Sequence, residues 1–335
     1  MNDTINESDL SLLAALCEAQ PDFVSGEALA ERLGVSRVSI KSRLDRLKEA
    51  GFEIEAARKQ GYALISEPPT LHPLMLELQL RKLGTELNWI LLDECASTND
   101  EAMRKLTEGA QSPLVVISRR QKAGRGRLGR RWHSDDDGNL MLSFGVRPDK
   151  PPAFMQRFTV WVGLRLAARL SNYSGVSVKA KWPNDLLING RKLAGILTEA
   201  RMDSDRMREL ILGLGLNINS AVDTWPDEVR NIATSLAYAS KQRFSMSAAT
   251  ALILTELVRA YEDYQNGEID AELDKLWAEY SAINHQSVTI STYDGLIEGE
   301  VVGIDSSSAL RLKLANGDIK TFAAGDVSLS GQLPA

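Results

Sequence analysis

Apolar residues recur at helical spacing through the N-terminal part of the chain. The pattern predicts three short helices, over residues 9–19, 26–33 and 36–50, with Ser25 and Ser36 as the N-caps of the second and third. The third helix is defined by its apolar positions, Val38, Ile40, Leu44 and Leu47. Its polar side is mostly basic. Two helices joined by a short turn that contains glycine, the second of them basic, predict a helix-turn-helix.

Strand-like alternation follows in residues 52–56 and 61–65, with Arg58, Lys59 and Gln60 at the turn between them. This N-terminal segment is therefore expected to be a winged helix with a basic wing tip. The alternative is a small helical interaction domain whose basic face is only solvated. We favour DNA binding, because basic residues fall on both elements that reach the grooves of a duplex. The candidate DNA contacts are Ser36, Arg37, Ser39, Lys41, Arg43, Arg58 and Lys59.

The stretch Glu67-Pro68-Pro69 indicates a linker, since proline interrupts helices and strands alike. Beyond it, strand patterns alternate with amphipathic helices. Strands are predicted over residues 87–92, 114–118, 139–146, 176–181, 186–188, 193–197 and 210–219, and helices over 99–107, 158–170, 247–264 and 269–280. Thr98 and Glu101 have the spacing of a capping box for the first of these helices. Asn189-Gly190 predicts a tight hairpin.

The C-terminal part of the chain is a run of short strands. They are predicted over residues 287–290, 297–304, 309–313 and 319–322, with Asp294-Gly295 and Asn316-Gly317 as turns. Such a run predicts a small SH3-like β-barrel. The chain is therefore expected to be an α+β multidomain protein, with a winged helix-turn-helix in residues 1–67, a mixed α/β domain in 70–284 and the barrel in 285–335.

Composition limits the possible functions. The 335 residues are 44% hydrophobic and 25% charged, with a formal net charge of -6. These values are typical of a globular protein and exclude a surface that is basic throughout, so any contact with DNA must be local. Two cysteines far apart in the sequence and three scattered histidines predict neither a disulfide framework nor a transition-metal site. No signal peptide or membrane-length apolar run is found, so we expect a cytoplasmic protein with no membrane contact.

Positive charge is concentrated in one stretch, Gln121-Lys122-Ala123-Gly124-Arg125-Gly126-Arg127-Leu128-Gly129-Arg130-Arg131-Trp132. Seven basic residues and no acidic residue lie between Arg119 and Arg131. Glycines let successive N–H groups turn toward one point, and arginine forks match the oxygens of phosphate or carboxylate. The spacing is neither that of a P-loop nor that of the dinucleotide fingerprint. Alone, the stretch predicts an anion site, and the alternative is a solvated or nucleic-acid-facing loop.

The predicted hairpin after Lys181-Trp182-Pro183-Asn184-Asp185 carries further candidates. Asp185 offers a hard oxygen ligand for Mg²⁺, Lys192 follows the turn, and Gly195 leaves room for a ligand beside the backbone. The structural alternatives are a turn aspartate and a lysine that protects a sheet edge.

A gap on one face of a strand is a further candidate feature. In the strand over 210–219, Gly213 and Gly215 remove side chains beside Asn217. The gap would suit a flat ligand, and a bulge would explain the glycines equally well.

Taken in order along the chain, these motifs resemble the biotin protein ligase family. The resemblance is carried by Ser97-Thr98-Asn99, Gln121-x-x-Gly124-Arg125-Gly126-Arg127, Trp132, Lys181-Trp182-Pro183-Asn184-Asp185 and Arg191-Lys192-Leu193-Ala194-Gly195-Ile196-Leu197. Together with the winged helix it spans nearly the whole chain and is similar to the bifunctional form, which is both ligase and biotin operon repressor. It also implies a central sheet like that of class II synthetases.

The resemblance implies a reaction and its partners. In that family the biotin carboxylate attacks the α-phosphate of ATP with Mg²⁺, which gives biotinyl-5′-adenylate and pyrophosphate. The biotinyl group then passes to a lysine of the biotin carboxyl carrier protein subunit of acetyl-CoA carboxylase. The resemblance also implies repression at an operator of biotin synthesis genes, by a homodimer that forms when the adenylate is bound.

Roles for individual residues follow from the same resemblance. Biotin contacts are implied for Ser97, Thr98, Asn99, Gln121, Gly124, Arg125, Gly126, Arg127, Lys192 and Gly195. ATP or adenylate contacts are implied for Arg127, Arg130, Trp132, Asn184, Asp185 and Asn217, with Asp185 also linked to the metal. The implied catalytic cations are Lys192, Arg125 and Arg127. Such cations are needed because biotin and ATP are both anions and repel each other at attack distance.

The C-terminal tail departs from the family pattern. Some members have an arginine after Gly-[Asp/Glu]-x-Ser-Leu that reaches the adenylate, whereas this chain reads Gly325-Asp326-Val327-Ser328-Leu329-Ser330. Two alternative functions stay open. One is a lipoate or octanoate ligase with the same sheet, which the arginine and glycine stretch disfavours. The other is a DNA-binding regulator that senses a nucleotide without catalysis.

Overall fold

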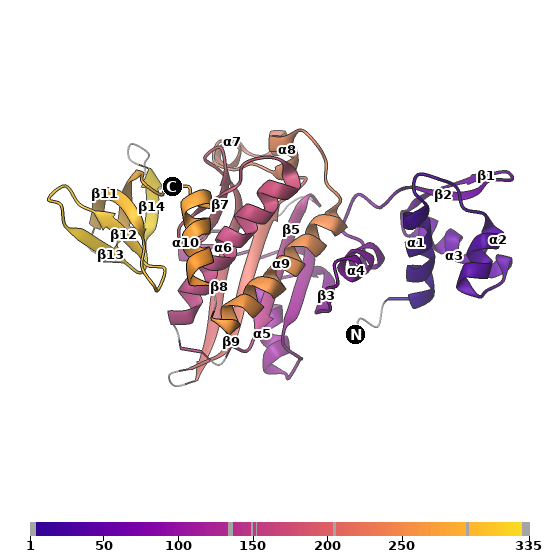
Figure 1. The fold of residues 1–335 in the computed structure, drawn as a ribbon, viewed down its shortest axis with the longest axis horizontal. Helices are drawn as coiled ribbons and strands as arrows, with labels where there is room; N and C mark the ends of the chain where they lie inside the picture. Colours follow the sequence, from indigo (N-terminus) through magenta and orange to yellow (C-terminus); the bar gives the residue numbers. More distant parts are fainter. Residues whose placement is uncertain are drawn as a thin grey trace. The chain divides into compact units, whose positions relative to one another are not determined.

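The structure is a computed structural model that describes residues 5–132, 137–148, 150–151, 153–203, 206–267, 269–292 and 295–329. The chain forms two compact units, Met1–Glu86 with Phe244–Thr255 and Leu87–Arg243 with Glu256–Ala335 (Figure 1). The predicted turn residue Asp294 and the departing tail residue Ser330 lie outside the described residues.

The first unit begins with the predicted winged helix. Its elements are α1 (Glu7–Ala19), α2 (Gly26–Leu33), α3 (Arg37–Glu49), β1 (Glu53–Ala57) and β2 (Gly61–Ser66). The predicted N-caps are confirmed, since the side chains of Ser25 and Ser36 accept hydrogen bonds from backbone N–H groups in the first turns of α2 and α3.

One apolar position of α3 does not join the core. Ile40, Leu44 and Leu47 are buried, whereas Val38 is 79% exposed. The three buried residues define a stripe at helical spacing, and Val38 lies roughly half a turn away from Ile40 around the helix. Counting Val38 with the core positions was therefore wrong.

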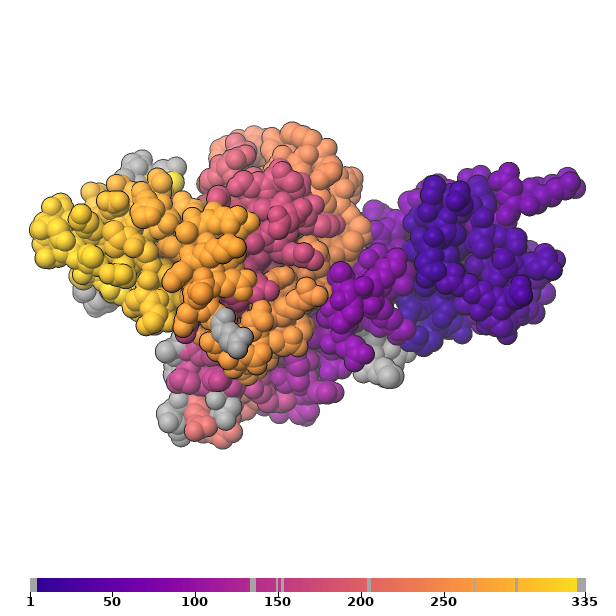
Figure 2. Space-filling view, viewed as in Figure 1, coloured from indigo at the N-terminus to yellow at the C-terminus, as the bar shows by residue number. Residues whose placement is uncertain are grey.

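The wing is an antiparallel hairpin of β1 and β2, and Figure 2 shows it standing out from the body of its unit. Close to its turn, the N–H of Val24 donates to the carbonyl of Tyr62 and the N–H of Tyr62 donates to the carbonyl of Val24, each at 2.9 Å. Gly61 precedes this pair with φ at +115°, and a Cβ there would lie 2.1 Å from the carbonyl oxygen of Val24. Only glycine fits this position without a shift of the backbone.

Helix α4 (Pro73–Lys82) is missing from the sequence prediction. Its apolar residues are too dense to show a helical period, and the buried ones are Met75, Leu76, Leu78 and Leu80. The helix packs against α1, where the Arg81 guanidinium lies 2.6 Å from Glu7. It thereby completes the core of the first unit.

The second unit is built on a seven-stranded sheet with the order β3-β4-β5-β9-β8-β7-β6. Strands β3 and β4 are parallel, and the other neighbours are antiparallel. The strands are β3 (Asn88–Cys95), β4 (Leu114–Gln121), β5 (Asn139–Val146), β6 (Lys179–Lys181), β7 (Asp185–Ile188), β8 (Arg191–Asp203) and β9 (Arg206–Asn217). Each overlaps a predicted strand. The predicted hairpin is confirmed, since Asn189 and Gly190 both have positive φ, at 49° and 76°.

Helices cover both faces of this sheet (Figure 1). The helical segments are α5 (Thr98–Thr107), η1 (Arg127–Gly129), α6 (Ala153–Ser174), η2 (Val222–Thr224), α7 (Asp227–Arg230), α8 (Leu236–Ser240), α9 (Met246–Asn266) and α10 (Asp270–Tyr280). Alternate residues of β5 point to opposite faces. A Cβ on Gly145 would meet Leu106 of α5, whereas Phe144 packs edge-on against Tyr261 of α9. The start of α5 is thus held against the sheet.

A five-stranded antiparallel sheet follows, with the order β13-β12-β11-β10-β14. Its strands are β10 (Ser287–Thr292), β11 (Gly295–Ile304), β12 (Leu310–Lys313), β13 (Ile319–Phe322) and β14 (Asp326–Leu329). The first four are predicted, and β14 is missing from the prediction. The indole N–H of Trp182 donates to the carbonyl of Ser308 at 2.9 Å, which joins this sheet to the end of β6.

Along the described part of the chain, no helix has the length and apolar character needed to cross a membrane. Cys17 and Cys95 are both free thiols, in line with the expected absence of a disulfide framework.

We predict that Gly61→Ala destabilises the winged helix by about 2 kcal/mol or more, because it combines a disfavoured φ with a backbone clash. Gly34→Ala is the matched control, since Gly34 also has positive φ but open space around it, and should cost about 1 kcal/mol. Urea unfolding read by amide hydrogen exchange in α1 to α3 measures both. Equal losses would contradict the role given to the Val24 contact.

Candidate functional site

The Arg/Gly loop, residues 122–131, follows β4 on the way to β5, at one end of the central sheet. Both strands are interior to the sheet. The loop folds back on itself. The N–H of Trp132 donates to the carbonyl of Gly124 at 3.0 Å, and the N–H of Gly126 donates to the carbonyl of Arg130 at 2.7 Å. Its backbone is therefore partly satisfied from within, and its side chains reach neighbouring elements.

Arg125 is paired with acidic residues of the same unit. Its guanidinium donates to both carboxylate oxygens of Asp100, at 2.6 and 2.8 Å, and lies 3.5 Å from Glu199. The hydrogen bonds that it donates to Asp100 raise the pKa of Arg125 above its ordinary value. Asp100 is on α5, so this pair ties the loop to the helix that carries Thr98 and Asn99.

Two further loop arginines, Arg127 and Arg130, converge on the C-terminal sheet. Arg130 donates to Asp326 at 2.7 Å, and Arg127 lies 3.7 Å from the same carboxylate. Arg127 also donates to the side-chain oxygen of Asn184 at 3.3 Å. Asp326 begins β14, so the tail contributes to the site through a carboxylate.

A buried polar network lies where α5 begins. The side-chain oxygen of Gln121 accepts from the N–H of Thr98 at 2.7 Å and from its hydroxyl at 3.1 Å. The hydroxyl of Ser143 lies 2.5 Å from Asn99 Oδ1 and 2.8 Å from Thr98 Oγ1. Ser143 has a single hydrogen to donate, and the amide oxygen can only accept, so Asn99 is the partner that requires it. Ser97 is buried beside this network.

The capping box predicted for Thr98 and Glu101 does not form. Ser97 is the N-cap, without a side-chain capping bond, and Thr98 is already the first residue of α5. Glu101 instead pairs with Arg104 on the surface, at 2.8 Å. The hydroxyl of Thr98 is thus free of capping and belongs to the polar network.

Two glycines of β9 bring site residues against the sheet. A Cβ on Gly213 would lie 2.3 Å from Asn99 Oδ1, and one on Gly215 would lie 2.4 Å from the Trp132 ring. The predicted gap is real, but Asn99 and Trp132 fill it. The indole N–H of Trp132 is buried without a hydrogen-bond partner, so a ligand acceptor there would satisfy it.

The hairpin of β7 and β8 places two predicted residues together. Lys192 Nζ lies 2.7 Å from Asp185 Oδ1 and 5.8 Å from the centroid of the Trp132 ring. A Cβ on Gly195 would lie 3.2 Å from Lys192 Cε, so the glycine makes room for this lysine. Nearby, burial lowers the pKa of Lys181. The hairpin therefore supplies cations to the same place as the loop.

Asn217 stabilises a segment that forms part of the wall of the site. It is buried, and its amide donates to the carbonyl of Thr234 at 3.0 Å. The same segment runs beside Lys192, whose N–H donates to the carbonyl of Ile232 at 2.7 Å. Asn217 thus fixes the chain that flanks the lysine.

Asp185 is the predicted metal ligand. The described residues contain no group of three or more His, Cys, Asp or Glu side chains placed to hold a metal ion. A single carboxylate suits Mg²⁺ only when phosphate oxygens and waters complete the octahedron. The donor set therefore fits a metal that arrives with a nucleotide.

Sequence reasoning missed four residues of this region: Asp100, Ser143, Glu199 and Asp326. A signal exists for Ser143, because it is the hydroxyl within the apolar run of β5 and is fully buried. The three carboxylates have no local signal, because their partners lie far away in the sequence.

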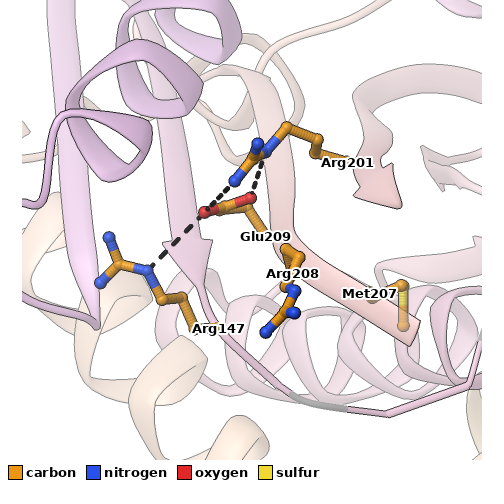
Figure 3. A pocket seen from close by; sticks show the side chains of 5 residues that line it. All are labelled: Arg147, Arg201, Met207, Arg208 and Glu209. Atoms are coloured by element: carbon orange, nitrogen blue, oxygen red, sulfur yellow. Dashed lines mark hydrogen bonds and ion pairs between the residues drawn. The ribbon is translucent and has the colours of Figure 1, made fainter. Parts of the chain in front are cut away.

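A pocket of about 400 Å³ lies at a different place, between β8, β9 and the end of β5. Figure 3 shows its charged lining. Arg201 donates to both oxygens of the buried Glu209, and Arg147 lies 3.8 Å from the same carboxylate. Arg208 pairs with Asp203, and Arg147 also donates to the carbonyls that end α5. Because these arginines are already paired with acidic or carbonyl groups, their contacts stabilise the fold. The pocket is therefore not the candidate site.

The candidate DNA contacts divide into two groups. Lys41 is exposed on α3, Arg37 makes an exposed 3.2 Å pair with Glu27, and Arg58 and Lys59 lie at the wing turn. Arg43 instead donates to the carbonyl of Ser8 on α1, at 3.4 Å. Of the two serines, Ser36 is the N-cap of α3, and its side-chain oxygen accepts a hydrogen bond from the N–H of Ser39 at 3.1 Å.

Comparison with known proteins gives matches along the whole chain. Residues 9–63 match the HTH domain family, residues 94–217 the Biotin/lipoate A/B protein ligase family, and residues 286–330 the Biotin protein ligase C terminal domain. Among solved structures, the biotin protein ligase from Aquifex aeolicus in complex with biotin and ATP is similar, with a TM-score of 0.60 and 26% identity. The match covers 72% of this chain and 98% of that chain.

Two curated relatives match from end to end. The bifunctional ligase/repressor BirA of Bacillus spizizenii is 32% identical over 318 residues, which is 95% of this chain and 97% of that protein. The bifunctional ligase/repressor BirA of Escherichia coli K12 is 30% identical over 327 residues, which is 97% of this chain and 98% of that protein. The chain therefore belongs to the family of the bifunctional ligase/repressor BirA.

Proposed function

We propose that this chain activates biotin with ATP and transfers it to a lysine of an acceptor protein, and that it represses transcription when loaded. One observation carries the enzyme proposal. Four segments far apart in the sequence converge on one place: the start of α5, the Arg/Gly loop, the β7–β8 hairpin and the glycines of β9.

The polar network at the start of α5 suits the ureido ring of biotin. That ring presents a carbonyl oxygen and two N–H groups, and Thr98, Asn99, Gln121 and Ser143 offer hydroxyl and amide groups of both kinds. The network is buried, so a hydrogen bond left unmade there is costly, and a ligand that completes it is selected. Trp132 and Lys192 lie toward the carboxylate end in this arrangement.

The cations suit the adenylation step. The biotin carboxylate oxygen forms a bond to the α-phosphorus of ATP while the bond to the bridging oxygen breaks and pyrophosphate leaves. Arg125, Arg127 and Lys192 offset the repulsion of the two anions and the charge that develops at phosphorus. Magnesium, held by phosphate oxygens with Asp185, supplies further positive charge when bound.

Transfer completes the reaction. The amine of an acceptor lysine attacks the acyl carbon of biotinyl-5′-adenylate, AMP leaves, and the amine loses a proton. We propose the biotin carboxyl carrier protein subunit of acetyl-CoA carboxylase as the acceptor. No nucleophile of this chain is needed for the step.

The DNA-binding proposal rests on the basic residues of α3 and the wing, with operator DNA of biotin synthesis genes as the target. We propose a homodimer in the adenylate-bound state, because two winged helices read two half-sites. We also propose domain boundaries near residues 67 and 285, a class II synthetase-like central sheet, closure of the last five strands into an SH3-like barrel, and a cytoplasmic location.

Simple measurements distinguish the proposed biotin ligase activity from two other functions. A lipoate or octanoate ligase would exchange pyrophosphate with lipoate or octanoate and without biotin. A regulator that only senses a nucleotide would bind biotin or ATP and exchange no pyrophosphate. Biotin-dependent exchange excludes both.

We predict that Arg127→Ala lowers the rate of biotin-dependent pyrophosphate exchange into ATP on the order of a hundredfold, because it removes a positioned cation from the reacting phosphate. Arg120→Ala is the matched control, since Arg120 belongs to the same basic stretch but is 69% exposed on β4 and pairs with Asp137. Its exchange rate should match the parent. Equal effects of the two substitutions would remove the loop from the mechanism.

We predict that Ser143→Ala raises the KM for biotin about tenfold, because Asn99 Oδ1 loses its buried donor. The KM for ATP should change little. Ser118→Ala is the matched control, since Ser118 is also buried on a neighbouring strand but donates to the carbonyl of Arg120 at 2.7 Å. A biotin KM equal to that of the parent in the Ser143 variant would show that the network does not hold biotin.

A further inference from the structure

Among the described residues, Val38 is the most exposed large hydrophobic residue. Its exposed fraction is 79%, and it stands at the second position of α3, directly after the N-cap and Arg37. A β-branched residue there neither favours the helix nor adds to the core, whose stripe is Ile40, Leu44 and Leu47. Neither helix propensity nor packing within its own unit therefore explains it.

Charge along α3 indicates which end of the helix meets DNA. The first turns present Arg37 and Lys41 and no acidic side chain, whereas toward the C-terminal end Asp45 and Glu49 offset Arg46 and Lys48. Phosphates are therefore attracted more strongly to the first turns than to the C-terminal end. Helix-turn-helix proteins read base edges with the N-terminal residues of the second helix, so the charge asymmetry matches that docking.

Two of the longer side chains of α3 that could contact bases are instead bound to α1. Arg46 donates to the carboxylate of Asp9 at 2.5 and 3.1 Å, and Arg43 donates to the carbonyl of Ser8. Both hold α3 against α1. On the exposed face around the first turn, Val38 stands with Lys41 and Ser42, at the spacing of one helical turn. Val38 is the apolar member of that face.

An apolar side chain in the major groove has one base partner of matching chemistry. Thymine alone carries a methyl group at C5, and apolar side chains discriminate it by contact. Building on the proposed DNA binding, we infer that Val38 is a specificity-determining residue that contacts the C5 methyl group of a thymine in each operator half-site. Lys41 and Arg37 bind phosphates beside it and hold the helix in register.

The test uses the full chain with biotin, ATP and Mg²⁺. A duplex enriched by the parent protein from a random pool is resynthesised with each thymine replaced in turn by deoxyuridine, which lacks only the methyl group. Binding to the parent and to Val38→Ala is measured by fluorescence anisotropy. We expect one thymine per half-site at which deoxyuridine weakens the parent about fourfold, the value of one buried methyl group. Val38→Ala should bind the thymine and deoxyuridine duplexes equally.

Because Val38 is exposed, the alanine variant leaves no cavity and its folding is not at issue. Lys41→Ala is the control for a phosphate contact. It should weaken all the duplexes alike and lower the salt dependence by about one charge per protomer. The inference is overturned if no deoxyuridine weakens the parent, or if Val38→Ala keeps the same sensitivity. Failure to enrich any duplex, with or without biotin and ATP, would instead overturn the DNA-binding proposal and this inference with it.

Discussion

Mutual repulsion among fixed cations is the constraint on which the active-site region depends. Arg125, Arg127, Arg130 and Lys192 converge on one end of the central sheet, and in this structure each lies near a carboxylate: Asp100, Asp326 or Asp185. These pairs are partly exposed, and such pairs contribute only about 0–1 kcal/mol to stability. They are therefore weak enough to exchange for the oxygens of a substrate. The carboxylates keep the cations assembled, and in the proposed reaction the substrates would need only to displace these carboxylates.

The carboxylates that pair with these cations come from different parts of the chain. Asp100 comes from α5, Asp185 from the β7–β8 hairpin and Asp326 from the last strand. Asp326 is the acidic position of the tail motif, and it pairs with two loop arginines. The tail thus reaches the site here through an acidic side chain. Its effect on the loop is opposite in sign to that of an added cation.

Much of this architecture could be predicted from the sequence, because it rests on short-range patterns. The caps Ser25 and Ser36, the Asn189-Gly190 turn and the strand runs are all local signals. What escaped prediction depends on packing. The apolar residues of helix α4 are too closely spaced to show a helical period, and Val38 lies on the side of α3 opposite to its core stripe. Thr98 joins a buried polar network instead of capping α5. The same holds for the site, because its basic residues form a recognisable stretch in the sequence, whereas their carboxylate partners are scattered.

The overall charge of the chain bears on how it can recognise DNA. A formal net charge of -6 repels a duplex at long range, so attraction from the few basic residues of α3 and the wing has to overcome it locally. Two of the α3 arginines, Arg43 and Arg46, are engaged with α1 and add little to that attraction. Weak phosphate binding lowers affinity for every sequence equally, whereas contacts to base edges act only at the right one. Because non-specific binding is already suppressed, a protein of this charge gains selectivity when it relies on base contacts.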